Sequence, residues 1–328
     1  MYTGSPRRGF TLVELLVVIF IVLTITVATI PVVLPAIENR QMRESARLVS
    51  GYLADARAQA MRSGRPAGVL IERPEDGTNG SFVLAQCEVP LPWSGDSMWA
   101  RAVITPMGGT YDFDFATPQI SWLHQIRNGD LVKLNYQGRH YRIAGSPADD
   151  EGHLEWGSLP WKLEAVTVGD PPPPVSTNVP FQIIRQPVRT AAQPLTLPPG
   201  IVVDLDFSGV GNTNSFALGS ESVIILFAPD GSLAAVFSEA SGTWQAQRLT
   251  AAVHLLIGRR EKVGSLTGDV NDNLGDLSNR WVSIQHRTGL VSTSENLGGN
   301  STVDPADLPN ELSGARQLAI LARGMGGR

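Results

Sequence analysis

Residues 7–36 constrain the fold of this chain more than any other stretch. Arg7 and Arg8 precede Gly9, and an apolar run of about 25 residues follows, which is long enough for a helix to cross the hydrocarbon core of a bilayer. The run carries one charged residue, Glu14, near its start. A carboxylate inside such a segment costs about 2.5 kcal/mol or more, so it indicates a partner and a purpose.

Two ordinary explanations of this stretch are open. A secretory signal peptide has a shorter apolar core, followed by a small-residue cleavage site, whereas this run is longer and the residues near Ala28 offer no such site. A plain membrane anchor predicts the same topology, because Arg7 and Arg8 stay on the cytoplasmic side. Only Glu14 distinguishes a plain anchor from a helix that packs against others, since an isolated anchor gains nothing from a carboxylate.

The short basic leader, Gly9, Phe10 and Glu14 together resemble the class III signal of type IV pilins and of type II secretion pseudopilins. The resemblance implies that prepilin peptidase cleaves between Gly9 and Phe10 and methylates the new N-terminal amine of Phe10. It also implies that Glu14 pairs with the N-terminal amine of a neighbouring subunit during assembly. Burying both charges offsets much of their attraction, so this pairing sets register more than it adds stability.

Pro31 lies where that family commonly has a proline that bends the helix, and Pro35 follows one turn later. A proline inside a helix removes a backbone hydrogen bond and bends the helix axis. Two interpretations are open: the prolines end the membrane helix, or they let a longer helix curve as subunits pack.

Charge and cysteine content exclude some classes of protein. The formal net charge is −5, and it becomes −7 once residues 1–9 are removed. No clustered basic face of the kind that binds nucleic acid is evident. Cys87 is the single cysteine, so an intramolecular disulfide is impossible, and we expect it to be a small buried apolar residue. The histidines form no metal-protease pair and the chain has no nucleophile elbow, so we expect no enzyme.

The rest of the sequence predicts an α+β fold, with a long N-terminal helix packed on antiparallel β-sheets and a β-rich insertion. Apolar residues recur every three or four positions from Glu38 to Ser63, and Gly64 and Pro66 end that helix. Short alternating strands and turn sequences follow. The predicted parts are a leader, a membrane helix, an amphipathic helix, a β domain in two pieces, an insertion and a tail: 1–9, 10–36, 37–64, 65–87 with 196–293, 88–195 and 294–328.

The order of the strands resembles that of minor pseudopilins of the GspH/FimT type. Three short sequences carry this resemblance: 197–201 (Leu-Pro-Pro-Gly-Ile), 227–231 (Phe-Ala-Pro-Asp-Gly) and the Thr288-Gly289 turn. Together with the N-terminal signal, the resemblance covers residues 7–87 and 196–293, a little over half of the chain.

Residues 88–195 depart from that pattern and contain most of the tryptophans: Trp93, Trp99, Trp122, Trp156 and Trp161. Residues 131–143 predict a hairpin with a glycine turn. The tryptophans either form the core of a small β subdomain or present an aromatic contact surface to a partner.

One polar loop offers a candidate Ca²⁺ site. Oxygen-bearing side chains alternate along it as they do in a calcium-binding loop: Asp269, Asn271, Asn273 and Asp276. Leu274 and Arg280 stand where an EF-hand needs glycine and glutamate. The alternative is an ordinary turn rich in Asp and Asn, and no other cofactor is expected.

The sequence therefore favours a pseudopilin or pilin-like structural subunit, anchored in the inner membrane by a single span with its C-terminal domain in the periplasm. The expected partners are other pilins or pseudopilins in a filament, prepilin peptidase and the inner-membrane assembly platform, with no nucleic acid. The alternative is a membrane-anchored module that binds a polymer through its aromatic insertion.

Overall fold

The computed structural model describes most of the chain. Residues with a described backbone are 12–108, 110–116, 126–144, 160–166, 173–217, 222–240, 243–247, 249–264, 272–297 and 308–325. Side chains are not described for a subset of these: 27–37, 176–177, 239–240, 243–245, 247, 308–309 and 322–325.

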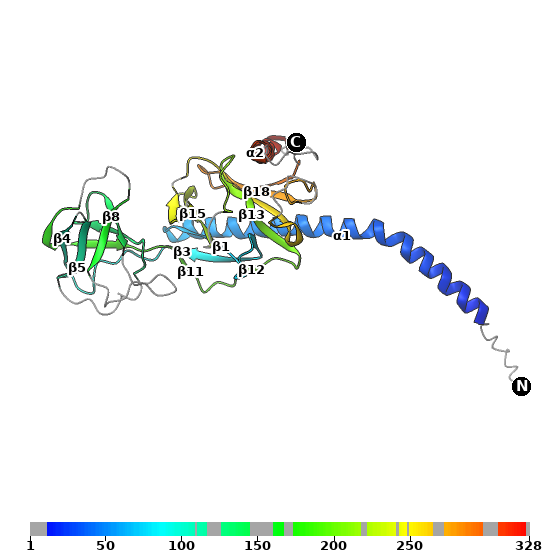
Figure 1. Cartoon of the computed structure of the whole chain (residues 1–328), viewed down its shortest axis with the longest axis horizontal. Helices are drawn as coiled ribbons and strands as arrows, with labels where there is room; N and C mark the ends of the chain where they lie inside the picture. The colour runs from blue at the N-terminus through cyan, green and yellow to red at the C-terminus, as the bar shows by residue number, and fades with distance from the viewer. Residues whose placement is uncertain are drawn as a thin grey trace, which may run out of the picture.

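Helix α1 (Leu12–Ser63) is one continuous helix that begins with the N-terminal apolar segment (Figure 1). Its second half enters the head of the molecule, by which we mean the part formed by residues 38–89 and 187–325. It continues through Pro31 and Pro35, so neither proline ends it. The helix ends where Gly64, with a φ of 65°, donates its N–H to the Ala60 carbonyl. Glycine adopts this left-handed conformation without steric cost, which explains the predicted stop.

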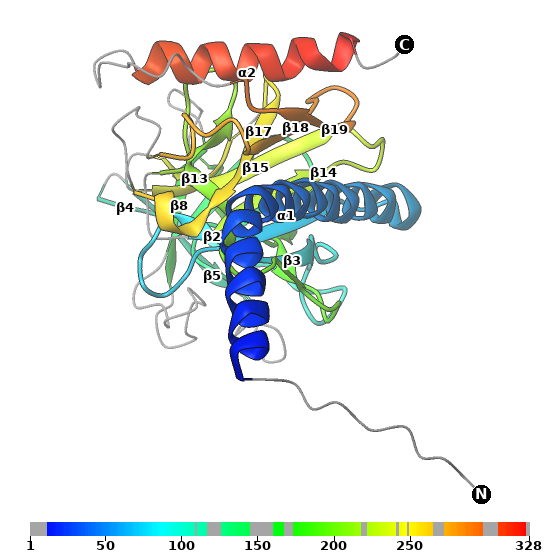
Figure 2. The same cartoon turned by 90° about the vertical axis from the view of Figure 1, so that its right-hand side faces the viewer.

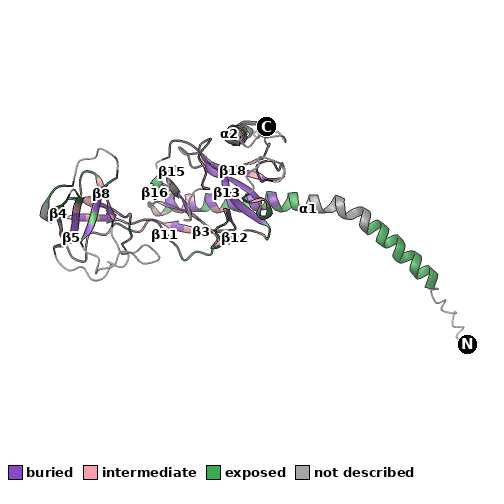
Figure 3. Cartoon of the chain, in the orientation of Figure 1, coloured by how far each residue is buried: buried purple, intermediate pink, exposed green. Residues whose placement is uncertain are grey.

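The two halves of α1 differ in burial (Figure 3). Side chains of residues 12–26 are exposed, whereas the second half buries one face at helical spacing: Met42, Ala46, Val49, Leu53, Ala56 and Ala60. Among the described residues, no helix contains an 18-residue stretch apolar enough to count as a membrane span.

Sheet A lies against α1 and is antiparallel throughout, in the order β11-β3-β1-β14-β15-β16, with β12 also paired to β3. Gly68 lets β1 approach β14 closely, because a Cβ there would lie 2.0 Å from the Ile225 carbonyl oxygen. Its strands are β1 (Ala67–Glu72), β3 (Val83–Glu88), β11 (Val188–Arg189), β12 (Leu195–Thr196), β14 (Val223–Phe227), β15 (Leu233–Ala240) and β16 (Thr243–Gln247).

Sheet B, in the order β19-β18-β17-β13-β2, is also antiparallel and lies between the two α-helices (Figure 2). Its strands are β2 (Gly80–Ser81), β13 (Ile201–Val210), β17 (Val253–Arg259), β18 (Arg280–Ile284) and β19 (Val291–Glu295). One face joins the core that α1 shares with sheet A, and the other packs against helix α2 (Leu308–Met325). Helix α2 covers Phe207, Leu256 and Trp281 of this sheet.

Strands β4 to β10 form a third antiparallel sheet with its own core, beside the head and on the side away from the N-terminus (Figure 1). β9 and β10 stand at opposite ends of the strand order, yet only Pro180 separates them in sequence. The sheet therefore closes on itself as a small barrel. Its strands are β4 (Ala102–Met107), β5 (Thr110–Phe115), β6 (Leu131–Leu134), β7 (His140–Ala144), β8 (Trp161–Ala165), β9 (Ser176–Val179) and β10 (Phe181–Ile184).

The aromatic residues of this barrel fill its interior. Phe113, Phe115 and Phe181 contact one another at centroid distances of 5.2–6.0 Å, and Trp93 and Trp161 join them. The predicted hairpin is present as β6 and β7. Among the five tryptophans of the insertion, Trp93 and Trp161 belong to this core, Trp99 is 72% exposed, and Trp122 and Trp156 lie outside the described residues.

The α+β prediction is confirmed in this architecture. Helix α1 and the antiparallel sheets are present, and the second half of α1 packs on them.

Candidate assembly site

The first half of α1 presents an apolar surface all the way around. Exposed fractions of its large apolar side chains run from 48% for Val17 to 79% for Leu12. A helix that is apolar on every side is stable only where other helices or lipid surround it. This segment is therefore built for an apolar environment that the head of the molecule does not supply.

The two described hydroxyl groups in this half of the helix, those of Thr24 and Thr26, are satisfied within the helix itself. Thr24 Oγ1 donates to the Phe20 carbonyl and Thr26 Oγ1 to the Val22 carbonyl, each at 2.8 Å. Because each hydroxyl already has a backbone acceptor, neither needs water. Both threonines are thus compatible with burial among lipids or other helices.

The two predicted assembly residues, Glu14 and Pro31, both lie in α1. Glu14 is in the first turn of α1, and Pro31 lies within the helix, where the structure describes only its backbone. Gly9 and Phe10 lie outside the described residues, so their cleavage and methylation stay predictions.

Arg57 connects α1 to both sheet A and sheet B. Its Nε–H donates to the Gly231 carbonyl at 2.9 Å and to the Thr288 carbonyl at 3.1 Å. The turn after β14 and the turn after β18 therefore meet at one guanidinium group. They touch each other as well, since a Cβ on Gly289 would lie 2.0 Å from the Gly231 oxygen. Two of the sequences that carry the pseudopilin resemblance thus meet at Arg57.

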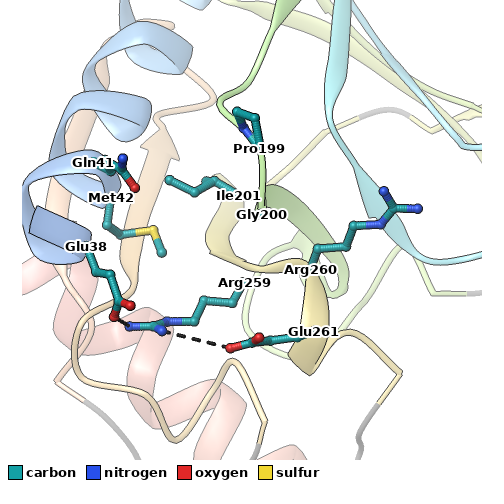
Figure 4. A pocket seen from close by; sticks show the side chains of 9 residues that line it. All are labelled: Glu38, Gln41, Met42, Pro199, Gly200, Ile201, Arg259, Arg260 and Glu261. Atoms are coloured by element: carbon teal, nitrogen blue, oxygen red, sulfur yellow. Dashed lines mark hydrogen bonds and ion pairs between the residues drawn. The ribbon is translucent and has the colours of Figure 1, made fainter. Parts of the chain in front are cut away.

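The third of those sequences lines a cavity where α1 leaves the head (Figure 4). This cavity of about 570 Å³ lies between α1, the loop before β13 and the 3₁₀ turn η3 (Arg260–Lys262). Arg259 extends across it, contacting Glu38 on α1 at 2.8 Å and Glu261 at 3.9 Å. The lining is Glu38, Gln41, Met42, Pro199, Gly200, Ile201, Arg259, Arg260 and Glu261.

The described members of the candidate calcium loop have other partners. Asn273 is buried, where its amide donates to Asp204 at 2.6 Å and its oxygen accepts from the Arg259 N–H at 2.7 Å. Asp276 accepts from the Lys262 ammonium at 2.8 Å, which with other hydrogen bonds holds its pKa below the usual value despite partial burial. An adjacent ammonium opposes a Ca²⁺ ion at that carboxylate.

The other two predicted ligands, Asp269 and Asn271, lie outside the described residues. Within the part of the chain that the structure describes, no three His, Cys, Asp or Glu side chains are grouped as metal ligands. The calcium hypothesis gains no geometric support from Asn273 or Asp276.

Several buried groups between sheet B and α2 have strongly shifted pKa values. Burial raises the pKa of Asp204 to about 7 and lowers that of His254 to about 3, the latter with help from nearby Arg316. Burial likewise lowers the pKa of Arg316 to about 9. Each has structural hydrogen bonds: Asp204 with Asn273, His254 with Ser283, and Arg316 with the Phe207 carbonyl. These contacts satisfy only part of the polar atoms, because His254 Nε2 and Arg316 Nε are buried with no hydrogen-bond partner among the described residues.

Burial also raises the pKa of Cys87 to about 12, so its thiol is un-ionised at neutral pH. The prediction that Cys87 is a small buried residue is confirmed.

Comparison with known proteins identifies the N-terminal segment alone. Residues 4–30 match the prokaryotic N-terminal methylation motif. No similar curated protein and no similar solved structure was found. The chain therefore carries a class III prepilin signal, and that signal runs directly into the exposed apolar half of α1.

Proposed function

We propose that this chain is a minor pseudopilin or pilin-like structural subunit of a type II secretion or type IV pilus-like filament. The methylation motif at residues 4–30 carries the proposal, because this signal belongs to pilin-like precursors. The continuity of α1 supports it, because one helix joins the signal to the core of the head. The position of the N-terminal segment among its neighbours therefore also determines the position of the head.

In this proposal the chain is a substrate and a building block, and it catalyses no reaction. Prepilin peptidase cleaves it between Gly9 and Phe10, and residues 10–36 hold it in the inner membrane with the head in the periplasm. The assembly platform then transfers it to a filament, where its apolar helix packs against those of other subunits. Glu14 pairs with the N-terminal amine of a neighbour, and Pro31 lets the helix adapt during packing.

The first test is the mature N-terminus of the protein recovered from membranes, with and without co-expressed prepilin peptidase. N-terminal sequencing should begin at Phe10, and the intact mass should be about 14 Da above that of the cleaved chain because of one methyl group. A Gly9→Val variant should retain the leader. A chain that still begins at Met1 in the presence of active peptidase would contradict the proposal and favour a plain membrane anchor.

Assembly is a separate question from processing, and Glu14→Ala separates the two. We expect this variant to be cleaved and methylated normally but to be missing from sheared filaments, while Thr24→Ala enters them. Normal incorporation of Glu14→Ala would contradict the assembly role of this carboxylate.

A further inference from the structure

Strand β19 forms an open edge of sheet B. It is the last strand in the order of that sheet, and its described pairing is with β18 alone. The backbone N–H of Gln285 donates to the Leu290 carbonyl, and that of Asn296 donates to the Asn279 carbonyl. These two bonds determine which residues of β19 direct their backbone groups toward β18. Residues 291, 293 and 295 must therefore direct their backbone N–H and C=O groups away from the sheet. Such an edge is a template for one further strand.

Helix α1 runs lengthwise beside this strand. At one end Arg57 contacts the Thr288 carbonyl, and at the other Arg43 and Arg47 share a cavity of about 180 Å³ with residues 293–295. Arg280 also lines this cavity and forms an ion pair with Glu295 at 2.9 Å. Among the described residues, Arg43 and Arg47 have no ion-pair partner. In the described part of the chain, two guanidinium groups with no ion-pair partner thus lie next to a strand edge with no pairing strand.

The spacing of the two arginines matches an extended peptide. Arg43 and Arg47 are one helical turn apart, about 6 Å along the axis. Alternate side chains on one face of a strand are about 6.8 Å apart. A strand added beside β19 would therefore present residues i and i+2 to both guanidinium groups at once.

We propose that the β19 edge, with Arg43 and Arg47, is a docking site for an extended acidic segment of a different polypeptide. The segment adds a strand to sheet B through its backbone, and carboxylates at alternate positions pair with the two arginines. Backbone pairing supplies affinity without sequence preference, and the arginines select acidic residues. This site involves neither the N-terminal signal nor the apolar first half of α1, so it is independent of the proposed filament role.

The test is binding of a labelled peptide, Thr-Glu-Val-Glu-Val-Glu-Thr, to the full chain in detergent micelles, followed by fluorescence anisotropy. Three altered peptides accompany it: one with Gln for every Glu, one with the three Glu residues consecutive, and one with N-methylated alternate amides that cannot pair with a strand edge. We expect each altered peptide to bind at least about tenfold more weakly, which corresponds to about 1.4 kcal/mol.

Variants of the chain test whether Arg43, Arg47 and the β19 edge bind the peptide. The double variant Arg43→Ala with Arg47→Ala should weaken binding of the acidic peptide about tenfold or more and leave the Gln peptide unaffected, whereas Arg62→Ala, an exposed arginine of the same helix, should change neither. Thr293→Pro removes an outward N–H without removing a bond to β18, and should weaken both peptides. Melting temperatures of the variants verify that each remains folded.

Absence of binding at millimolar peptide would overturn the proposal. Equal binding of the N-methylated peptide would exclude strand addition, and equal binding by the double-arginine variant would exclude the acidic partner.

Discussion

At the scale of single residues, a buried arginine of α2, Arg316, lies close enough to a buried histidine of sheet B, His254, to lower its pKa. Arg316 donates to the carbonyls of Phe207, Gly211 and Asn214 at 2.7–2.9 Å, so α2 is held by hydrogen bonds as well as by apolar contact. His254 lies near it with its Nδ1 2.9 Å from the Ser283 hydroxyl. Because the folded state keeps His254 neutral beside a cation, acid should weaken this region.

The predicted pH dependence follows from the pKa of His254, which falls from 6.5 to about 3 on folding. Between these values the unfolded chain binds a proton that the folded chain excludes, so stability decreases as the pH falls below about 6.5. The slope from this group approaches about 1.4 kcal/mol per pH unit. A His254→Gln variant should lose less stability than the parent between pH 7 and pH 4.5, measured by urea denaturation in mild detergent.

Asp204 and Asp130 act in the opposite direction, since burial raises their pKa values to about 7 and about 6. Their contributions to the free energy of unfolding diminish as the pH rises. Both groups are present in the parent and in His254→Gln, so their contributions cancel when the two pH profiles are compared. Parallel pH profiles for parent and variant would show that His254 is not neutral in the folded state.

At the scale of elements, α1 is one helix with two different surroundings. Its second half buries a narrow stripe in the core that joins sheets A and B, and its opposite side stays exposed. Burial of this stripe, rather than intrinsic helix propensity, stabilises the helix within the head.

A matched pair of leucines on α1 tests this division. Leu53 is fully buried in the shared core, and Leu48, little more than one turn away, is 40% exposed. Leu53→Ala should lower the free energy of unfolding by about 2–5 kcal/mol because it leaves a cavity. Leu48→Ala should lower it by less than about 1 kcal/mol. Similar losses for both, measured by urea denaturation, would contradict the observed packing.

At the scale of the whole molecule, the barrel is inserted into one edge of sheet A without interrupting it. Glu88 at the end of β3 pairs directly with Val188 of β11, so the two strands that carry the chain out and back are neighbours. The barrel also has a core separate from that of the head. Close termini and a separate core are what an inserted domain requires.

Excision of the barrel is therefore expected to leave the head folded. Residues 89–187 can be replaced by an Asn-Gly turn, which suits a two-residue connection between the paired residues Glu88 and Val188. The shortened chain should keep a cooperative melting transition, and filament incorporation then reports whether the barrel is needed for assembly. An aggregated or non-cooperative product would show that the head depends on the barrel.

Local sequence determined those elements whose signals are local. Gly64 ended α1 where predicted, and residues 229–232 formed the turn between β14 and β15, with Asp230 accepting from the Ser232 N–H. The apolar stripe of α1 was also predictable, because helical periodicity reports which face is buried. The N-terminal signal was recognisable for the same reason: its charges and apolar run lie within one short segment.

Tertiary structure decided everything that depends on residues distant in sequence. Closure of the barrel through Pro180, the meeting of two glycine turns at Arg57 and the partners of Asn273 and Asp276 all join segments far apart along the chain. Spacing makes Asn273 and Asp276 resemble calcium ligands, and only the fold shows that a carboxylate from β13 and a lysine from η3 contact them. Local pattern specifies which face of an element is apolar, and only the folded arrangement specifies which polar groups meet there.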